Sequence, residues 1–559
     1  MFRDISQVKE HCTVNPQEEE ALGSPMRPIV LLEQRSGVVK AFAAGVNNTS
    51  RFVGAFLPSF GLQYLLLDAL GPLVMTSANI SDLPIITNDA DILSLAEHTG
   101  DGSFCVEHTG DGSFCVKPPH DDNTAKPPSI TGILYNERRI AAGLDDSIVR
   151  IIDNTTQLIR RSKGYVPSPV YLQAADILTK DKMIFAAGAH LKSAFALSKG
   201  AYSYLSRHIG DIETIEAETV YRETFDRMKA FFDIEPTLAV CDMHPRYYPT
   251  RFAESLGLPL LYVQHHHAHI ASVMAEHGLR GPVTGVAFDG TGYGEDKAIW
   301  GGEILVCEDA EFERFSHLSY VDMIGGDESM KDAWKSAVAH LHSLKQHEAS
   351  IVAGRGKTGN SAGLPESAAI RRAPGTFGID LADIIAFCEE HGTLDGKAND
   401  RIAVEAALRA GKGVVKTSSM GRLFDAVCAM LGIHYENRYE GECAIMLENA
   451  ARRAAIKQTG RKERPLLSVS LLSEQERLAL SFHTSVAQEI LLQCTYARDE
   501  YGIRKVALSG GVFQNKVLME ETLRLLRKEG FAVYYNIHVP PNDGGIALGQ
   551  NYIGMLSIT

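Results

Sequence analysis

Short apolar runs separated by glycine-containing turns set the pattern of the chain beyond residue 180. Three of them, at 183–188, 193–198 and 201–205, follow one another closely and predict an antiparallel meander. The next two runs, at 238–241 and 259–263, are each followed by a stretch with helical spacing. This β–α–β–α order predicts that a parallel sheet continues the meander. The two helical stretches are 250–256 and 268–276.

The same order of elements recurs further along the chain. Apolar runs at 283–288 and 298–306 flank a glycine-rich turn and predict a second hairpin. Two more runs, at 505–509 and 531–535, flank a helix expected at about 515–528 and so predict a second β–α–β unit. Two copies of a hairpin and a β–α–β unit around a cleft are typical of a duplicated actin-like nucleotide-binding fold.

The first 175 residues form a separate region, with strand-like runs at 27–32 and 72–79 and helical stretches between them. Within this region the ten residues 97–106 are repeated without change at 107–116. We interpret the repeat as a tandem duplication in a surface loop, because added loop length costs little free energy.

Composition and charge narrow the class of protein. The chain has 559 residues, 45% of them hydrophobic and 22% charged, which is close to the globular average. A net charge of −14 provides no basic surface for nucleic acid. No apolar run approaches the roughly 20 residues that cross a membrane, and the polar start lacks a signal-peptide core, so we expect a cytoplasmic protein. Nine scattered cysteines without CxxC spacing predict buried thiols.

Four histidines crowd the segment Gln264-His-His-His-Ala-His269. His265 and His269 are four residues apart at the start of a helix, so both rings can face one ion. Histidines bonded to backbone are the alternative, but four of them at the carboxyl end of a strand favour a metal site. The pattern lacks the glutamate of HExxH zinc proteases. Asp543, in Pro540-Pro-Asn-Asp-Gly-Gly545, is either a helix N-cap or a third ligand.

Two glycine-rich turns are candidate phosphate sites. In Asp289-Gly-Thr-Gly-Tyr-Gly294 the backbone N–H groups can approach a phosphate while the carboxylate holds a cation, although an ordinary hairpin turn is the alternative. In Leu508-Ser-Gly-Gly-Val-Phe-Gln-Asn515 a strand runs through Gly510 and Gly511 into a helix, whose first N–H groups can bind a nucleotide.

Taken together, the motifs resemble those of the HypF family of hydrogenase maturation factors. Residues 178–559 resemble its Kae1-like domain, an actin/hexokinase-type ATPase fold, with an insertion at about 345–415. Residues 1–175 resemble the later part of its YrdC-like α/β domain. The motifs that carry the resemblance include Ala187-Gly-Ala-His-Leu-Lys192, Cys241-Asp-Met-His-Pro245, Tyr439-Glu-Gly-Glu442, Thr76-Ser-Ala-Asn79, Asp145-Asp-Ser-Ile-Val-Arg150 and the four segments described above.

The resemblance implies a carbamoyltransferase. It implies that carbamoyl phosphate and ATP give carbamoyl-adenylate, and that the carbamoyl group then passes to the C-terminal cysteine of a HypE-type acceptor protein. It also implies a divalent metal, Fe or Zn, with Mg²⁺ as a further candidate beside the nucleotide. The implied catalytic and metal-binding residues are His265, His269, Asp289 and Asp543. The implied nucleotide-binding residues are Ser77, Asn79, Ser147 and Arg150 in the first domain, and Asp289, Gly290, Thr291, Gly292, Gly510, Gly511 and Asn515 in the second.

Several features depart from the family pattern. The acylphosphatase-like domain, the cysteine-rich zinc segment and the first half of the YrdC-like domain are absent from the sequence. Leu144 stands where the family usually has Arg, and Asp332-Ala-Trp334 where Glu-Pro-Trp is expected. We therefore expect either a truncated gene product or half of a split enzyme with a separately encoded N-terminal half, and an uncovered sheet edge or apolar face in the partial domain.

Three other functions stay open. Relatives of both domains serve threonylcarbamoyl transfer to tRNA, but the acidic charge and the lack of a glutamate in the histidine run disfavour it. Carbamoylation of a small-molecule hydroxyl is a close variant. A non-catalytic remnant that binds nucleotide and metal is the third alternative.

Overall fold

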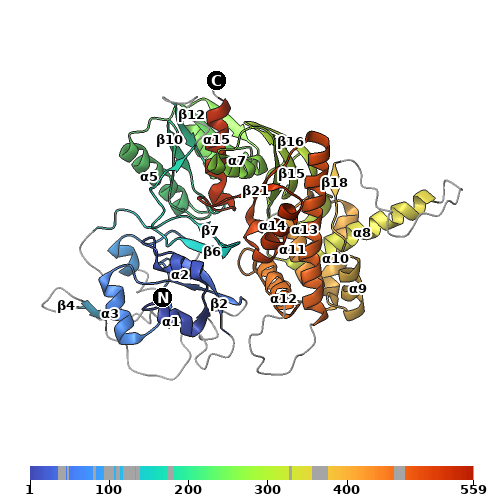
Figure 1. Ribbon diagram of the computed structural model, residues 1–559, viewed down its shortest axis with the longest axis horizontal. Coiled ribbons are helices and arrows are strands. Elements are labelled where there is room, and N and C mark those ends of the chain that lie inside the picture. Colours follow the sequence, from blue (N-terminus) through green and yellow to red (C-terminus); the bar gives the residue numbers. More distant parts are fainter. Residues whose placement is uncertain are drawn as a thin grey trace.

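The computed structural model describes residues 1–35, 46, 50–79, 83–93, 106–108, 114–116, 133, 139–172, 182–325, 330–355, 375–458 and 473–557. Three sheets of five or six strands, with helices packed on them, make a mixed α/β fold, as predicted. An N-terminal unit, blue in Figure 1, lies against two lobes of similar topology.

The N-terminal unit is a five-stranded sheet in the order β1, β2, β6 and β7, with β3 also paired to β2. The β2–β6 pair is parallel and the other pairs are antiparallel. Its strands are β1 (Cys12–Thr13), β2 (Ile29–Gln34), β3 (Phe52–Ala55), β6 (Ile148–Ile152) and β7 (Thr155–Arg160). Its helices are α1 (Ile5–His11), α2 (Pro16–Gly23) and α3 (Gly61–Leu70).

The first lobe contains the predicted meander and parallel pairs. Strands β9, β10 and β11 are antiparallel, and β9 then pairs in parallel with β12, and β12 with β13. The strands are β8 (Val170–Tyr171), β9 (Met183–Ala186), β10 (Ala196–Lys199), β11 (Tyr202–Leu205), β12 (Leu238–Asp242) and β13 (Leu260–Val263). The helices are α5 (Ile215–Phe232), α6 (Tyr248–Ser255), α7 (His265–His277) and the C-terminal α15 (Ile546–Ser557).

The second lobe repeats this order, which confirms the predicted duplication. Strands β14, β15 and β16 are antiparallel, while β14 pairs in parallel with β20, and β20 with β21. The strands are β14 (Val283–Phe288), β15 (Gly302–Glu308), β16 (Glu311–Leu318), β18 (Thr376–Phe377), β20 (Lys505–Ser509) and β21 (Ala532–Tyr535). Two of its helices are α13 (Glu474–Tyr501) and α14 (Lys516–Lys528).

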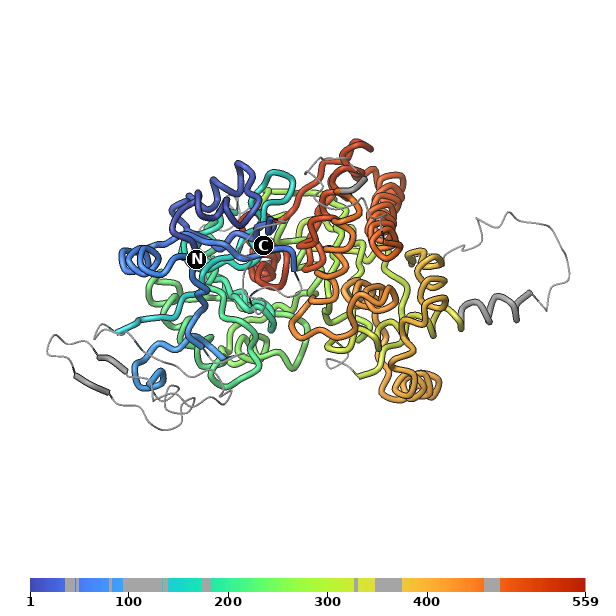
Figure 2. The backbone as a smooth tube through the Cα atoms, turned by 90° about the horizontal axis from the view of Figure 1, so that it is seen from below, coloured from blue at the N-terminus to red at the C-terminus, as the bar shows by residue number. Residues whose placement is uncertain are grey.

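A further group of helices packs on the second lobe, and most of the group lies at the end of the molecule away from the N-terminal unit, yellow to orange in Figure 2. It comprises α8 (Ala333–Arg355), α9 (Ala382–His391), α10 (Ala398–Ala410), α11 (Met420–Met430) and α12 (Glu442–Gln458), with the hairpin of β17 (Val321–Ile324) and β19 (Val414–Thr417). The segment 345–415, interpreted as an insertion, falls within this group. Residues 356–374 of that segment lie outside the described part of the chain.

Three local expectations need correction. The strand expected at 72–79 was wrong: no strand forms there, because an apolar composition by itself does not supply a partner strand. Helix α7 starts at His265 instead of Ala268, because the Gln264 side chain caps it by accepting the His267 N–H. The second hairpin strand starts at Gly302 instead of residue 298, because residues 289–301 form a closed turn with Trp300 N–H bonded to Gly292 O at 2.9 Å.

The repeated segment lies mostly outside the described residues. Within it, β4 (Val106–His108) and β5 (Phe114–Val116) pair antiparallel. Seven cysteines are buried free thiols, as predicted: Cys12, Cys241, Cys307, Cys388, Cys428, Cys443 and Cys494.

An apolar surface is exposed on and beside α3. The exposed fractions are 55% for Phe60, 42% for Leu62, 67% for Leu65, 66% for Leu70 and 70% for Val74. Such a run of large apolar side chains is unusual on a protein surface. Among the described residues, no helix combines the length and apolar character needed to cross a bilayer.

Helices α7 and α15 pack closely against each other between the two lobes (Figure 1). Gly549 permits this approach, since a Cβ added there would lie 1.9 Å from Ala268 O. Ile270, Met274 and Leu548 are fully buried in the surrounding core. The close packing fixes the start of α7 relative to the start of α15, where the candidate site lies.

Candidate metal and nucleotide site

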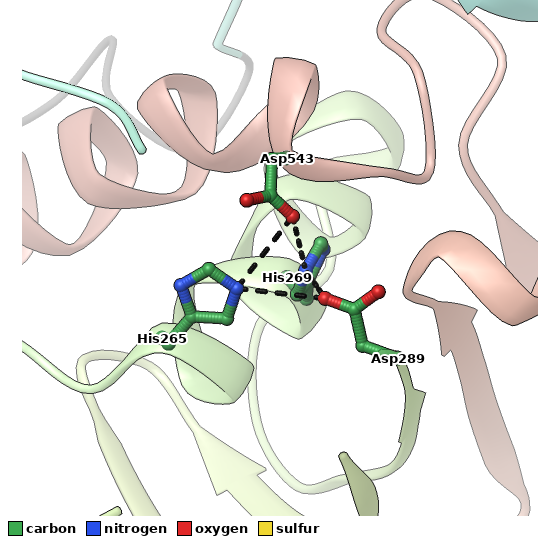
Figure 3. Close-up of side chains that lie close together, drawn as sticks. All are labelled: His265, His269, Asp289 and Asp543. Atoms are coloured by element: carbon green, nitrogen blue, oxygen red, sulfur yellow. Dashed lines mark hydrogen bonds and ion pairs between the residues drawn. The ribbon is translucent and has the colours of Figure 1, made fainter. Parts of the chain in front are cut away.

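Four side chains from three separate parts of the sequence meet between the lobes (Figure 3). His265 and His269 lie one turn apart on α7, Asp289 follows β14, and Asp543 opens the short 3₁₀ turn before α15. One ligand atom of each residue lies within 4.8 Å of the others. The structure therefore brings together the four residues that the family pattern implies for a metal.

The distances between these donors suit one shared ion. His265 Nε2 lies 3.6 Å from Asp289 Oδ2 and 3.7 Å from Asp543 Oδ1, and His269 Nε2 lies 3.2 Å and 3.9 Å from the same oxygens. With ligand bonds of about 2.1 Å, donors around a tetrahedral ion lie roughly 3.4 Å apart.

Burial supports the same conclusion. His265 and His269 are at most 2% exposed, and the two aspartates are 7% and 9% exposed. Among the described residues, the buried His265 Nε2 has no hydrogen-bond partner, and orphaned nitrogens of this kind are rare in proteins unless an ion or water satisfies them. Two imidazoles with carboxylates suit Fe(II) or Zn(II) better than Ca²⁺, so the residues fit the implied metal.

The charges in the cluster are strongly coupled. Burial by itself lowers the pKa of His265, but the Asp242 carboxylate at Nδ1 and the nearby carboxylates of Asp289 and Asp543 outweigh it and raise that pKa well above its usual range. Burial opposes ionisation of Asp289 as well, but His265 and His269 together hold the pKa of Asp289 well below its usual range. The carboxylate of Asp289 is therefore ionised and available to a cation.

The other two histidines of the run have a different role. Burial lowers the pKa of His267 to about 3, and its ring lies 4.8 Å from that of Phe312. Burial also holds the pKa of His266 well below the usual range, and its ring lies against the Gly292 backbone, where a Cβ would approach within 2.3 Å. Both are neutral core groups outside the cluster.

The two glycine-rich turns lie beside Asp289. Gly511 N–H donates to Asp289 Oδ1 at 3.1 Å, so the turn after β20 reaches the candidate cation site. Gly290 O accepts from Ser419 Oγ at 2.7 Å, which holds the turn after β14 in place. Gly510 has φ +103°, and a Cβ there would lie 2.1 Å from Phe288 O, so backbone geometry already requires glycine.

The contacts of Asn515 and Thr291 say less about nucleotide binding. Asn515 caps α14 by accepting the Leu518 N–H, and its side-chain nitrogen lies 2.9 Å from His483 Nε2. These partners give Asn515 a structural role. Thr291 is half-buried within the turn that Asp289 opens.

The four residues expected in an adenylation pocket have different surroundings in the structure. Ser77 Oγ donates to Asn79 Oδ1 at 2.7 Å on the surface, while Ser147 is buried and accepts from Ser162 N–H at 2.8 Å. Arg150 is buried in an ion pair with Glu448 of α12, with Nη2 and Oε1 2.6 Å apart. The described contacts of Arg150 thus join the N-terminal unit to the second lobe.

Sequence reasoning missed Asp242 as a partner of the cluster. Its Oδ2 lies 2.8 Å from His265 Nδ1, and its side chain is 1% exposed. The available signal was an acidic residue at the carboxyl end of a strand that runs parallel to the strand before His265.

Comparison with known proteins agrees with this architecture. The model described as carbamoyltransferase, Kae1-like domain, second subdomain, matches residues 285–550, and the HypF Kae1-like domain model matches residues 179–276. A Sua5/YciO/YrdC model described as telomere recombination matches residues 1–111. The chain belongs to the HypF family. Its N-terminal unit is YrdC-like, and its two lobes are the Kae1-like part.

Several named HypF proteins are similar over nearly the whole chain. The carbamoyltransferase HypF of Synechocystis is 30% identical over 98% of this chain and 66% of its own length. That of Rhizobium leguminosarum is 31% identical over 98% of this chain and 64% of its own length. The chain therefore spans about two thirds of the length of these relatives.

Two solved HypF structures share the fold. Full-length HypF in the phosphate- and nucleotide-bound form has a TM-score of 0.78 and 31% identity, covering 99% of this chain and 65% of its own. The HypF of T. kodakarensis has a TM-score of 0.77 and 26% identity, covering 100% and 66%.

Proposed function

We propose that this chain carries out the carbamoyl transfer of the HypF family, from carbamoyl-adenylate to the C-terminal cysteine of a HypE-type acceptor protein. The observation that carries the proposal is the buried cluster of two imidazoles and two carboxylates beside the glycine turns of the second lobe. Such a donor set suits a divalent cation, and the adjacent backbone N–H groups suit a nucleotide phosphate.

The transfer exchanges one bond for another. The acceptor thiolate attacks the carbamoyl carbon and forms a C–S bond, the bond from that carbon to the phosphate oxygen breaks, and AMP leaves with the electron pair. A bound divalent ion would stabilise the charge that the AMP phosphate gains.

The residues of the chain orient and protect this chemistry. Asp289 Oδ1 accepts the Gly511 N–H at 3.1 Å, which directs Oδ2 toward His269 at 3.2 Å. Burial of the four donors keeps bulk water away from an adenylate that water would otherwise hydrolyse.

We propose ATP, with Mg²⁺, and carbamoyl phosphate as substrates of the preceding steps. Carbamoyl phosphate is hydrolysed to carbamate and inorganic phosphate, and the YrdC-like unit then joins carbamate to ATP, which gives carbamoyl-adenylate and releases pyrophosphate. Ser77, Asn79 and Ser147 are its candidate nucleotide contacts. Since the chain spans about two thirds of its relatives, we propose that this step also needs the remaining third, in a longer chain or as a separate N-terminal polypeptide.

The test separates the two steps. Supplied with preformed carbamoyl-adenylate, the chain is expected to carbamoylate the C-terminal cysteine of a HypE-type acceptor, read by mass spectrometry of the acceptor's C-terminal peptide. His269→Ala is expected to abolish the adduct. His277→Ala is the matched control, because its ring lies on the same helix but bonds to Tyr535 O at 2.8 Å, outside the cluster.

Two results would contradict the proposal. Transfer that survives His269→Ala would remove the cluster from the chemistry. Robust exchange of pyrophosphate into ATP by the chain alone, with carbamoyl phosphate present, would show that the YrdC-like unit needs no further polypeptide.

A further inference from the structure

We propose that Asp242 is a positioning residue that holds His265 in the tautomer able to bind a metal ion. The proposal rests on the metal site proposed above. Asp242 ends β12, which pairs in parallel with β13, and α7 follows β13 directly. The Asp242 carboxylate therefore reaches the edge of the sheet where His265 lies, and both side chains are at most 2% exposed.

Both oxygens of Asp242 are engaged. Oδ2 lies 2.8 Å from His265 Nδ1, and Oδ1 accepts the backbone N–H of His244 at 2.8 Å. An ionised carboxylate only accepts hydrogen bonds, so the shared hydrogen belongs to His265 Nδ1. Once the ring gives up its second proton to a metal ion, the lone pair is on Nε2, a buried atom without a hydrogen-bond partner among the described residues that faces Asp289 and Asp543.

His269 reaches the same tautomer through uncharged groups. Asn536 Nδ2 donates to Glu276 Oε1 at 3.3 Å and to Ser272 Oγ at 2.9 Å, so its Oδ1 faces Ser509. Ser509 Oγ donates to that Oδ1 at 2.7 Å and lies 3.5 Å from His269 Nδ1, which leaves its oxygen to accept the ring hydrogen. This contact is longer and neutral, hence weaker than the one between Asp242 and His265.

Asp242→Asn would reverse the hydrogen bond with almost no change in shape. The fixed backbone N–H of His244 needs an acceptor, so the Asn oxygen stays on that side and the NH₂ group turns toward His265. His265 Nδ1 must then accept, and the ring hydrogen moves to Nε2. A hydrogen on Nε2 occupies the position that an ion needs.

The experiment measures Zn²⁺ binding and the tautomer directly. Zn²⁺ affinity is measured on the full chain by competition with a chromogenic chelator, for the wild type, Asp242→Asn and Ser509→Ala. Asp242→Asn is expected to weaken Zn²⁺ binding by about 10- to 100-fold, which is the usual effect of replacing a residue that is hydrogen-bonded to a metal-binding histidine. Ser509→Ala is expected to weaken it less. Asp309→Asn is the control, since Asp309 is in an exposed ion pair with Arg280.

Nitrogen NMR of the metal-free, ¹⁵N-histidine-labelled protein reads the tautomer, at an alkaline pH where the His265 ring is neutral, with His265→Gln identifying the signal. The Nδ1–H form is expected in the wild type and the Nε2–H form in Asp242→Asn. An Nε2–H form in the wild type would overturn the proposal even if the variant failed to fold. Zn²⁺ affinity of a folded Asp242→Asn within about twofold of the wild type would overturn it too. A wild-type chain that binds no Zn²⁺, or binds it equally well after His265→Gln, would instead refute the metal site itself.

Discussion

Arg150 offers a stringent test of how the N-terminal unit is attached to the second lobe. Its Nη2 and Nη1 donate to Glu448 at 2.6 and 3.2 Å, and Nη1 also donates to Gln514 O at 2.8 Å. The guanidinium lies 4.4 Å from the centre of the Phe52 ring. We predict that Arg150→Met loosens the junction between β6 and α12.

The expected loss of stability follows from the burial of the ion pair between Arg150 and Glu448. The Arg150 and Glu448 side chains are 8% and 4% exposed, so removing the arginine leaves a carboxylate in a nearly dry site. Breaking a buried pair in this way costs about 3–5 kcal/mol. Lys516 N–H still donates to Glu448 Oε1 at 3.0 Å, so we expect a loss near the lower limit, about 3 kcal/mol.

Native-state hydrogen exchange of the β6 amides measures the loss at the junction itself. Glu448→Leu and the double variant complete a double-mutant cycle, in which the double variant is expected to recover much of the loss because no charge stays buried. A loss below about 1 kcal/mol with no coupling would refute the reasoning. Weaker ATP binding by Arg150→Met at unchanged stability would instead make Arg150 a nucleotide contact, as its motif predicts.

Three further predictions follow from the packing of the site. Gly549→Ala is expected to cost about 3 kcal/mol or more in thermal unfolding, because the added Cβ lies 1.9 Å from Ala268 O, whereas Gly23→Ala, with open space around it, is expected to be nearly neutral. The pKa of His267 is about 6.5 in the unfolded chain and about 3 in the folded protein. The stabilisation from this group is therefore fully present above pH 6.5, and the free energy of unfolding decreases by up to about 1.4 kcal/mol per pH unit as the pH falls toward 3. Urea unfolding at pH 5 and pH 7 is expected to show this loss for the wild type and a smaller one for His267→Leu. Zn²⁺ at 100 times its Kd is expected to stabilise the wild type by about 2.7 kcal/mol, and Asp543→Asn by much less; an equal thermal shift in both would exclude Asp543 as a ligand.

Much of the fold could be predicted from local patterns. The meander, the two β–α–β units and their duplication each follow from periodicity and turns within about 30 residues of sequence. The expected strand at 72–79 failed because a strand needs a partner, and apolar composition does not specify one. The start of α7 at His265 depended on the Gln264 cap, an interaction of one side chain with one N–H.

The candidate site could be predicted in part. The spacing of His265 and His269 follows from one helical turn, so the sequence alone places both rings on one face. Asp289 and Asp543 join them only because β14 and the turn before α15 end at the same place. The sequence pattern offered Asp543 as a third ligand, whereas the family pattern was needed to expect Asp289 as a fourth. Asp242 was missed, since nothing local relates it to a histidine 23 residues away.

The sequence by itself determined the elements, their duplication and the residue types able to bind a cation and a phosphate, because these depend on neighbours along the chain. The tertiary structure decided which of these residues lie together and what each of them contacts. The sequence pattern predicts that Gly510 leaves space for a nucleotide, yet its φ of +103° and its close approach to Phe288 O already require glycine. The family motif predicts that Arg150 contacts a nucleotide, yet its guanidinium is paired with the carboxylate of Glu448, 298 residues away. Both roles depend on which distant groups packing brings within a few ångströms, and that distance is a property of the folded chain alone.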